Sequence, residues 1–426
     1  MRFSGFRAPY PAIFVIWRAC GQKFGSPNNS TPHGFGIQSV CLAGVTVRFI
    51  KLGDFMRAVR CIRQMDLERY LAQRKRQFDE STSSIRNFEV FDFNYVPSRP
   101  LMREEVKPVI DALLRYQQTG IANNVLILGS RGSGKSVLAR YLMRLLSAED
   151  HLAFAYANCR QHNTSFKILA ALLGLRPRGC SLDELWQKYE QSQAGKVVFV
   201  LDEVDLISGK DRHKDILYLI SRSPRNHMAV LLSNNPKFLH GLDESTQSTL
   251  QPEIVHFRNY NATEIEQILA ERARAGLKAV PEAVIKEAAA MTAKNTNSDV
   301  RVAIKTLYLS ALEPKVRLRD HFEKARRDIM FDVVKDLNDK SLLILKAVRA
   351  CPDGLAKHVY EVYQKVSSEC HEESLSYMAF YSTLSYLQSL GLVVLLSTKV
   401  NRTYTNRIQL TFDASILLTV LQMRFA

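Results

Sequence analysis

The stretch Gly129-Ser-Arg-Gly-Ser-Gly-Lys-Ser136 directly follows four apolar residues, Val125-Leu-Ile-Leu128. A short apolar run before the pattern G-x-x-x-x-G-K-[ST] predicts a buried strand that ends in a phosphate-binding loop. In such a loop the glycines let backbone N–H groups turn toward phosphates, Lys135 reaches the β- and γ-phosphates, and Ser136 holds Mg²⁺. The helix predicted over 137–146 directs the positive end of its dipole at the same phosphates. The residues predicted to contact the nucleotide here are Gly129, Ser130, Arg131, Gly132, Ser133, Gly134, Lys135, Ser136 and Val137.

A second motif, Val197-Val-Phe-Val-Leu-Asp-Glu-Val-Asp205, places acidic residues directly after an apolar run. The pattern predicts a buried strand whose end reaches the active site. We expect Asp202 to bind Mg²⁺ through water, beside Ser136, and Glu203 to polarise the attacking water. Acidic pairs also end ordinary strands, but the position of this pair downstream of the phosphate loop favours the catalytic interpretation.

Two further motifs add polar side chains to this predicted site. Ala229-Val-Leu-Leu-Ser-Asn-Asn235 ends in amides, and Asn234 is placed to orient the lytic water or to sense the γ-phosphate. Asparagine after a strand is also a common turn former, which is the structural alternative. Arg301 lies near the start of a predicted helix, where it can reach the γ-phosphate. A solvated helix arginine is the alternative for that residue.

Composition narrows the class of protein. A length of 426 residues predicts about two or three domains. The formal net charge of +16 predicts a polyanionic partner, and nucleic acid before a membrane, because no apolar run of about 18 residues is present. A basic surface kept for solubility is the alternative. Seven scattered cysteines without a C-x-x-C pair fit reduced thiols, so we expect a cytoplasmic, nucleoid-associated protein without a zinc or disulfide framework.

The N-terminal part has a different composition from the rest. Residues 1–53 contain six basic residues and no acidic ones. We expect a disordered extension, or a start codon assigned upstream of the true start at Met56. An organellar transit segment is the alternative.

The order of predicted elements gives the domain organisation. Strands and helices alternate from 125 to 258, which predicts an α/β fold with a parallel sheet covered by helices on both faces. Helices without intervening strands follow and predict a lid. Three helices and two short β-runs at the C-terminus predict a winged helix. The predicted domains are an N-terminal extension at 1–86, a nucleotide-binding base at 87–258, a helical lid and linker at 259–335, and a winged-helix DNA-binding domain at 336–426.

The ordered set GSRGSGKS, VFVLDEVD, LLSNNPKFL and SDVRVAIKTL resembles AAA+ ATPases, and within them the archaeal initiators related to the origin-recognition and cell-division-cycle loading factors. The resemblance covers about 90–426. The segment Tyr95-Val-Pro-Ser-Arg-Pro-Leu-Met-Arg-Glu104 resembles the adenine-side box of that family, in which Val96, Pro97 and Arg103 match. The resemblance implies an ATPase with ATP or ADP and Mg²⁺ as ligands, Asn234 as sensor, and Arg301 as the lid residue that couples closure to ATP. It further implies binding of double-stranded origin DNA by a replication initiator, with the replicative helicase as a further partner to test.

Two departures from the family pattern bear on mechanism and on DNA binding. The family usually has an arginine where Ser245 aligns, so an arginine finger supplied to a neighbouring subunit is in doubt. Residues 374–391, the predicted recognition helix, contain no Lys or Arg, so base readout by arginine is unsupported. The predicted helix core is Met378, Phe380, Leu384 and Leu387. We therefore expect DNA contacts from the wing and from an ATPase insertion that also holds Arg160 and Lys167, through Arg176, Arg178, Tyr381, Gln388, Lys399, Arg402 and Arg407.

Three alternatives remain open from the residues alone. A P-loop signalling switch also joins a nucleotide domain to a winged helix, which then contacts protein. A non-hydrolysing DNA clamp is compatible with the missing arginine finger. A helicase-loading or transposition partner of the AAA+ class would bind a helicase in place of origin DNA.

Overall fold

The computed structural model describes residues 37–42, 45–50, 67–76, 79, 82, 84–149, 152–176, 179–193, 195–208, 211, 213–400 and 403–425. The chain divides into two compact units, 1–78 and 79–426. In the first unit, β1 (Ile37–Leu42) pairs antiparallel with β2 (Val45–Ile50), and residues 67–76 are helical. Of the predicted extension at 1–86, residues 1–36, 43–44, 51–66, 77–78, 80–81 and 83 lie outside the described residues.

The second unit begins with a five-stranded parallel sheet in the order β4-β5-β6-β3-β7. This sheet confirms the predicted α/β class, although β7 was not among the strands expected from sequence. Its strands are β3 (Val125–Gly129), β4 (Ala153–Asn158), β5 (Val197–Asp202), β6 (Met228–Ser233) and β7 (Glu253–Phe257). The helices around it are α3 (Val106–Thr119), α4 (Lys135–Glu149), α5 (Ser165–Leu172), α6 (Leu182–Ser192), α7 (Asp215–Ser221) and α8 (Glu244–Leu250).

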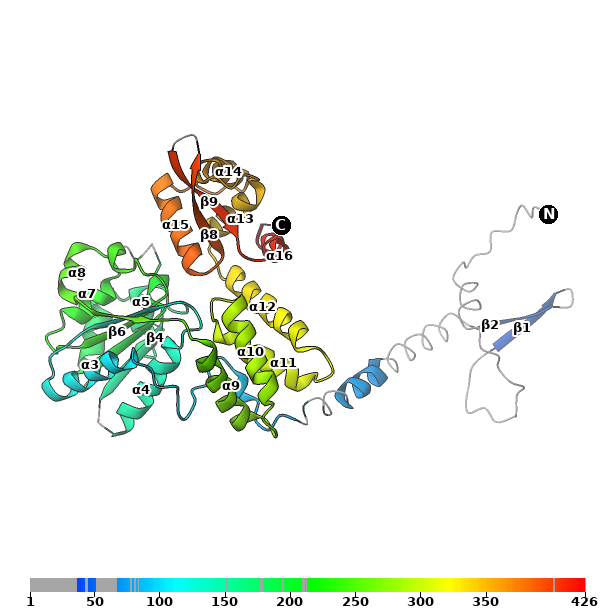
Figure 1. Ribbon diagram of the computed structural model, residues 1–426, viewed down its shortest axis with the longest axis horizontal. Helices are drawn as coiled ribbons and strands as arrows, with labels where there is room; N and C mark the ends of the chain where they lie inside the picture. Colours follow the sequence, from blue (N-terminus) through cyan, green and yellow to red (C-terminus); the bar gives the residue numbers. More distant parts are fainter. Residues whose placement is uncertain are drawn as a thin grey trace. The chain divides into compact units, whose positions relative to one another are not determined.

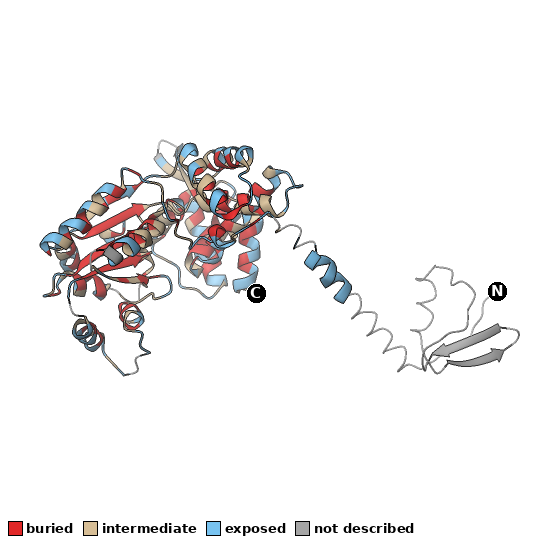
Figure 2. Ribbon diagram, turned by 90° about the horizontal axis from the view of Figure 1, so that it is seen from below, coloured by how far each residue is buried: buried red, intermediate tan, exposed pale blue. Residues whose placement is uncertain are grey.

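Helices cover both faces of this sheet because side chains alternate along each strand. In β3, Val125 and Ile127 face the core formed with α3 and α4, whereas Leu126 and Leu128 face the core formed with α5 to α8. The strands are buried between the two helical layers (Figures 1 and 2). The C-terminal ends of all five strands meet at one edge, which is where ligands bind in such sheets.

A helical lid and a long linker helix follow the sheet. The lid is α9 (Ala262–Gly276), α10 (Glu282–Asn295) and α11 (Val300–Leu312), and the linker is α12 (Leu318–Lys335). The lid core also includes Ile85, Val90 and Phe91, which precede the sheet in sequence. The segment before the sheet is therefore built into the lid.

The C-terminal region has the element order predicted for a winged helix, followed by one helix that was not expected. Its elements are α13 (Asp339–Ala350), α14 (Ala356–Glu369), α15 (Tyr377–Ser389), β8 (Val393–Val400), β9 (Thr403–Leu410) and α16 (Ala414–Phe425). Phe380, Leu384 and Leu387 are fully buried, as predicted. Met378 was wrongly assigned to this core and is 81% exposed. It precedes Phe380 by two residues, which is more than half a helical turn, so it lies on the opposite face.

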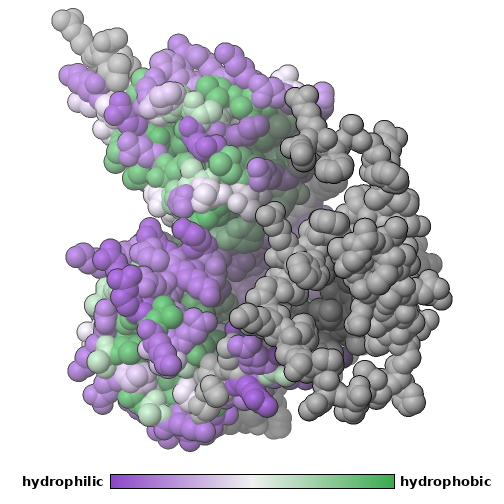
Figure 3. All heavy atoms as spheres, turned by 90° about the vertical axis from the view of Figure 1, so that its right-hand side faces the viewer, coloured by the Kyte–Doolittle hydropathy of each residue, from purple (hydrophilic) through white to green (hydrophobic). Residues whose placement is uncertain are grey.

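Among the described residues, no helix is both long and apolar enough to cross a membrane. On the face drawn in Figure 3, hydrophobic areas are separated by hydrophilic ones.

Candidate functional site

The predicted phosphate loop joins β3 to α4 and is closely covered by the lid. Gly132 and Gly134 have φ values of 77° and 89°, a region that side chains disfavour. A Cβ atom on Gly132 would lie 2.2 Å from Asp299 Oδ1, and one on Gly134 would lie 2.1 Å from the hydroxyl of Tyr260. Both glycines are therefore required by backbone conformation and by the close approach of neighbouring residues.

Lys135 lies at the centre of the loop and is almost completely buried. Its Nζ donates to the carbonyl oxygens of Gly129 and Ser130, at 2.8 Å each, and to Oδ1 of Asn234 at 2.9 Å. Burial lowers the pKa of Lys135 to about 8, although Asp202 and neighbouring carboxylates oppose the shift. The structure thus brings together Lys135 and Asn234, which were predicted from separate strands.

The acidic motif lies beside the loop at the end of β5. Asp202 is 3% exposed and accepts a hydrogen bond from the hydroxyl of Tyr156 at 2.9 Å. Glu203 adopts a left-handed backbone conformation with φ of 54°. Burial raises the pKa of Glu203, and the guanidinium groups of Arg160 and Arg131 oppose this shift. A raised carboxyl pKa is common where a carboxylate exchanges protons with substrate or water.

Asp205 connects the acidic motif to the sensor strand. Its Oδ1 accepts from Ser233 Oγ at 2.8 Å and from the backbone N–H of Asn234 at 3.1 Å. Asp205 belongs to the acidic sequence motif, but no role was predicted for it. The contacts show that it fixes the position of the sensor asparagine.

Arg301 enters the same site from the first turn of α11. The side chain of Asp299 caps this helix by accepting from the backbone N–H of Arg301 at 3.0 Å. The same carboxylate also holds the Arg301 guanidinium, with Nε 2.9 Å from Oδ1. Arg301 is therefore oriented by its own helix cap.

Lys135, Asp202, Glu203, Asn234 and Arg301 line one cavity of about 210 Å³ between the sheet edge and the lid. The cavity brings together the predicted catalytic residues and most of the phosphate loop. Its lining also includes Arg160, Arg272, Asp332 and Asp336, which were not predicted as nucleotide-site residues. Arg160 had been grouped with DNA-contacting residues, and the structure places it here because it directly follows β4.

A second, smaller cavity of about 70 Å³ continues from the first, and the two share Gly134, Val137, Arg272, Val300 and Ile304. Pro97 and Arg103 line it, whereas Val96 is half-buried and lines neither cavity. The Arg103 guanidinium donates to the carbonyl oxygens of Ser133 at 3.2 Å and Arg258 at 2.7 Å, and lies 4.5 Å from the Tyr260 ring centroid. These contacts tie the phosphate loop to the start of the lid.

Arg272 is a buried residue of α9 that no sequence motif pointed to. It donates to the carbonyl oxygens of Val90, Asp92 at 3.0 Å and Tyr95 at 3.5 Å. These contacts hold the segment that precedes α3 against the lid.

The predicted DNA-contacting residues lie apart from the nucleotide cavity and are mostly exposed. Lys399 and Arg407 are exposed on β8 and β9, and Lys399 Nζ lies 5.7 Å from the Tyr404 ring centroid. Gln388 and Arg176 are also exposed. Arg178 and Arg402 lie outside the described residues.

Tyr381 is half-buried and packs against other aromatic residues of the C-terminal region. Its ring centroid lies 5.1 Å from that of Tyr377 and 6.0 Å from that of Phe380. Burial raises the pKa of Tyr381 to about 12. This packing gives Tyr381, which was predicted to contact DNA, a structural role in the C-terminal region.

One end of α15 faces the ATPase base. Ser389 and Leu390 share a cavity of about 370 Å³ with Ser130 and Arg131 of the phosphate loop. Burial raises the pKa of Tyr386, and the nearby Arg131 opposes the shift. The predicted recognition helix therefore faces the nucleotide-binding base at its C-terminal end, which sequence did not predict.

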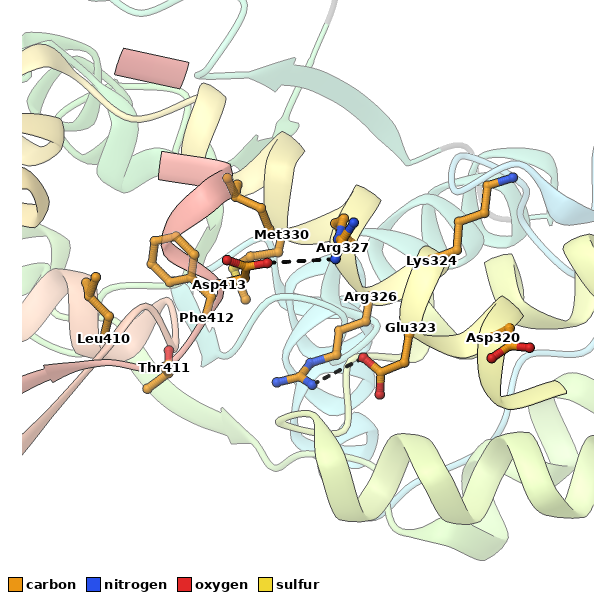
Figure 4. Close-up of a pocket in the computed structure, with 11 residues that line it drawn as sticks. Asp320, Glu323, Lys324, Arg326, Arg327, Met330, Leu410, Thr411, Phe412 and Asp413 are labelled. Carbon is orange, nitrogen blue, oxygen red and sulfur yellow. Dashed lines mark ion pairs between the residues drawn. The ribbon is translucent and has the colours of Figure 1, made fainter. Parts of the chain in front are cut away.

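The largest of these cavities, about 630 Å³, lies between α12 and the segment that joins β9 to α16 (Figure 4). Two ion pairs lie within its walls: Arg327 lies 3.7 Å from Asp413, and Arg326 lies 3.6 Å from Glu323. It holds none of the predicted nucleotide ligands, so its size alone does not make it the nucleotide site.

Comparison with known proteins agrees with this arrangement. A family model described as the AAA ATPase domain matches residues 99–232. The ORC1-type DNA replication protein 1 of Sulfurisphaera tokodaii is 30% identical over 359 residues, which cover 74% of this chain and 88% of that protein. The protein of the same name from Archaeoglobus fulgidus is 27% identical over 386 residues, which cover 81% and 93%.

Solved structures show the same fold. The ORC1 protein of Aeropyrum pernix in complex with DNA has a TM-score of 0.59 and 24% identity, covering 80% of this chain and 97% of that one. The ORC2 protein of the same organism, in ADPNP–ADP complexes, has a TM-score of 0.54 and 20% identity, covering 80% and 98%.

Proposed function

This chain belongs to the family of ORC1-type DNA replication proteins, and we propose that it is an ATP-dependent initiator that recognises double-stranded origin DNA. It is an ATPase of the AAA class. The observation that carries the site assignment is the single cavity that brings together Lys135, Asp202, Glu203, Asn234 and Arg301. We further propose that the base spans 87–258, the lid and linker 259–335, and the winged helix 336–426.

The geometry supports a separate role for each of these side chains during hydrolysis. Lys135 exchanges its contacts with the loop carbonyls for the β- and γ-phosphates. Glu203 accepts the proton of the attacking water, and Asn234 orients that water from the neighbouring strand. Arg301 reaches the γ-phosphate from the lid, so that bound ATP draws the lid toward the base.

The residues present also fit Mg²⁺. Ser136 and Asp202 line the same cavity, and no cluster of three or more His, Cys, Asp or Glu that could hold a metal occurs among the described residues. This matches an ion that is held by one or two protein oxygens together with the phosphates. Bound there, Mg²⁺ would neutralise charge on the phosphates.

We propose that the smaller cavity receives the base of the nucleotide. Its walls are largely apolar, and among the described residues that line it Glu271 is the one carboxylate. Burial raises the pKa of Glu271, and the charge of Arg272 and a hydrogen bond from the Arg99 backbone oppose the shift. A carboxylate accepts from the amino group of adenine but repels the carbonyl oxygen at the same position of guanine, so Glu271 favours adenine.

The proposed binding of DNA is supported by the positive charge of the chain. The net charge of +16 and the exposed Lys399 and Arg407 on the β8–β9 hairpin suit phosphate contacts. The Aeropyrum pernix ORC1 protein was solved with DNA, and we extend that property to this chain as a proposal.

The test is footprinting on duplex DNA that flanks the gene for this protein, with and without ATP, followed by a salt titration of the protected site. Log affinity should fall linearly with log salt, with a slope near −0.9 per phosphate contacted. Lys399→Ala and Arg407→Ala should each reduce the slope by about one unit. Lys278→Ala, which removes an exposed charge at the end of α9, is the matched control and should leave the slope unchanged.

Binding that does not respond to salt or to the hairpin variants would instead favour a winged helix that contacts protein. Loading of the replicative helicase is a further step in this proposal. Co-purification of that helicase with the ATP-bound protein on origin DNA would support it, and capture of the helicase without DNA would favour the helicase-partner alternative.

A further inference from the structure

Arg160 lies at the catalytic end of the nucleotide cavity, where the sheet itself positions it. In the parallel pairing of β4 with β5, Asn158 is the partner of Asp202. The next residue, Cys159, donates its backbone N–H to the Asp202 carbonyl oxygen at 2.8 Å. The backbone N–H of Arg160 then bonds to the Asn158 side chain at 2.9 Å, which turns the chain toward the cavity.

Two carboxylates hold the guanidinium of Arg160 in place. Its Nη1 lies 4.0 Å from Oε1 of Glu203, and its Nη2 lies 2.9 Å from Oδ2 of Asp336. The side chain is 36% exposed, so it retains freedom to move toward a phosphate. Because Glu203 is the proposed general base, a group this close to its carboxylate is also close to the γ-phosphate.

Two of the other guanidinium groups that line the cavity are held by neighbouring groups. Arg272 is engaged by three backbone carbonyl groups, and Arg301 is bound by the carboxylate of Asp299. Arg131 is half-buried, and its Nε has no hydrogen-bond partner among the described residues. Among the described arginines of this cavity, Arg160 is the one that forms an ion pair with Glu203.

An arginine is needed here because the transferring phosphoryl group carries developing negative charge in the transition state. An arginine supplied by the same chain or by a partner stabilises that charge. Residues 236–257, which include Ser245, contain no arginine that this chain could offer to a neighbouring subunit.

We propose that Arg160 is a catalytic residue that stabilises the transferring phosphoryl group within its own chain. This inference rests on the proposed nucleotide site. Water attacks the γ-phosphorus, its proton passes to Glu203, and the bond from that phosphorus to the bridging oxygen breaks to release ADP and phosphate. Arg160 moves from Glu203 to the equatorial oxygens as Glu203 takes up the proton, and it neither gains nor loses a proton itself.

The test compares three variants in full-length protein. Arg160→Ala should lower kcat on the order of 10³-fold, with the Kd for ATP changed by less than about threefold, because the contact forms in the transition state. Turnover per molecule should not depend on protein concentration, since the arginine acts within one chain. Arg222→Ala, an exposed arginine after α7, is the control and should match the parent.

A binding measurement separates catalysis from stability. Arg160→Ala should lose affinity for ADP with tetrafluoroaluminate, which resembles the transition state, while its affinity for ADP alone is unchanged. Asp336→Asn removes the same ion pair with α12 but keeps the guanidinium, and should lower kcat by less than about tenfold.

Several outcomes would overturn the proposal. Parental or raised turnover in Arg160→Ala would show that the arginine is dispensable or restrains Glu203. An equal loss in Asp336→Asn and Arg160→Ala would assign Arg160 to linking the base to α12. Turnover per molecule that rises with protein concentration would point to a residue from a second copy. A parent protein that binds no ATP would instead refute the proposed function itself.

Discussion

Burial of Lys135 predicts that ATP binding takes up a proton in mildly alkaline solution. In the free protein the pKa of Lys135 is lowered to about 8 from an ordinary value of 10.5, chiefly by burial. The phosphates of ATP favour the charged ammonium, so the pKa rises again when ATP binds. Because the protonated form is the one that binds, affinity is nearly full at pH 7 and below, and falls as the pH rises through the free-state pKa.

The expected loss of ATP affinity at high pH follows from the Lys135 pKa of about 8. At pH 9 roughly one molecule in eleven of the free protein has a protonated Lys135, so ATP should bind about tenfold more weakly than at pH 7. At pH 8 about half a proton should be taken up for each ATP bound. The relevant ionisation of phosphate lies near pH 6 and contributes little in this window.

Isothermal titration calorimetry at pH 8, in two buffers with different ionisation enthalpies, counts the protons directly. Lys135→Arg keeps a cation that stays protonated, so its affinity should be flat between pH 7 and 9. Glu203→Gln should keep a pH-dependent affinity whose midpoint lies slightly below that of the parent, because the Glu203 carboxylate helps to raise the pKa of Lys135. An affinity that does not change from pH 7 to 9, or an equal dependence in Lys135→Arg, would refute this account of Lys135.

Three further predictions address other parts of the site. Glu203→Gln should bind ATP normally and lose turnover by on the order of 10²-fold or more, measured by phosphate release; unchanged turnover would make Glu203 a structural residue. Arg301→Ala should abolish the protection from limited proteolysis that ATP gives the lid, and protection that survives would place Arg301 outside the coupling. Glu271→Gln should narrow the preference for ATP over GTP by roughly tenfold in competition binding, because a charged acceptor is lost; an unchanged preference would remove Glu271 from base recognition.

Sequence predicted the parts of the site that depend on short local patterns. Lys135 lies in the loop after β3, Asp202 ends β5 and Asn234 follows β6, and each is preceded by an apolar run. The strand ends of a parallel sheet meet at one edge, so these patterns indicated a common site before any distance was known. Arg301 was predicted from its position near a helix start.

The remaining residues of the site depend on contacts that no local pattern carries. Arg160 meets Asp336, and Arg131 lies near Tyr386, across separations of more than a hundred residues. An isolated arginine is equally compatible with a solvated surface or a DNA contact, which is why Arg160 was misplaced. Met378 was misplaced for a different reason: an apolar residue in a helix does not by itself reveal which face it occupies.

Helix α15 has a consequence for any redesign of the proposed DNA contacts. One face of this helix forms the C-terminal core, and its end, with Tyr386, Ser389 and Leu390, faces the phosphate loop. A library that randomises the whole helix would therefore also change residues that face the nucleotide-binding base. Variation confined to the exposed positions Met378, Ser382 and Gln388 leaves Tyr386, Ser389 and Leu390 unchanged.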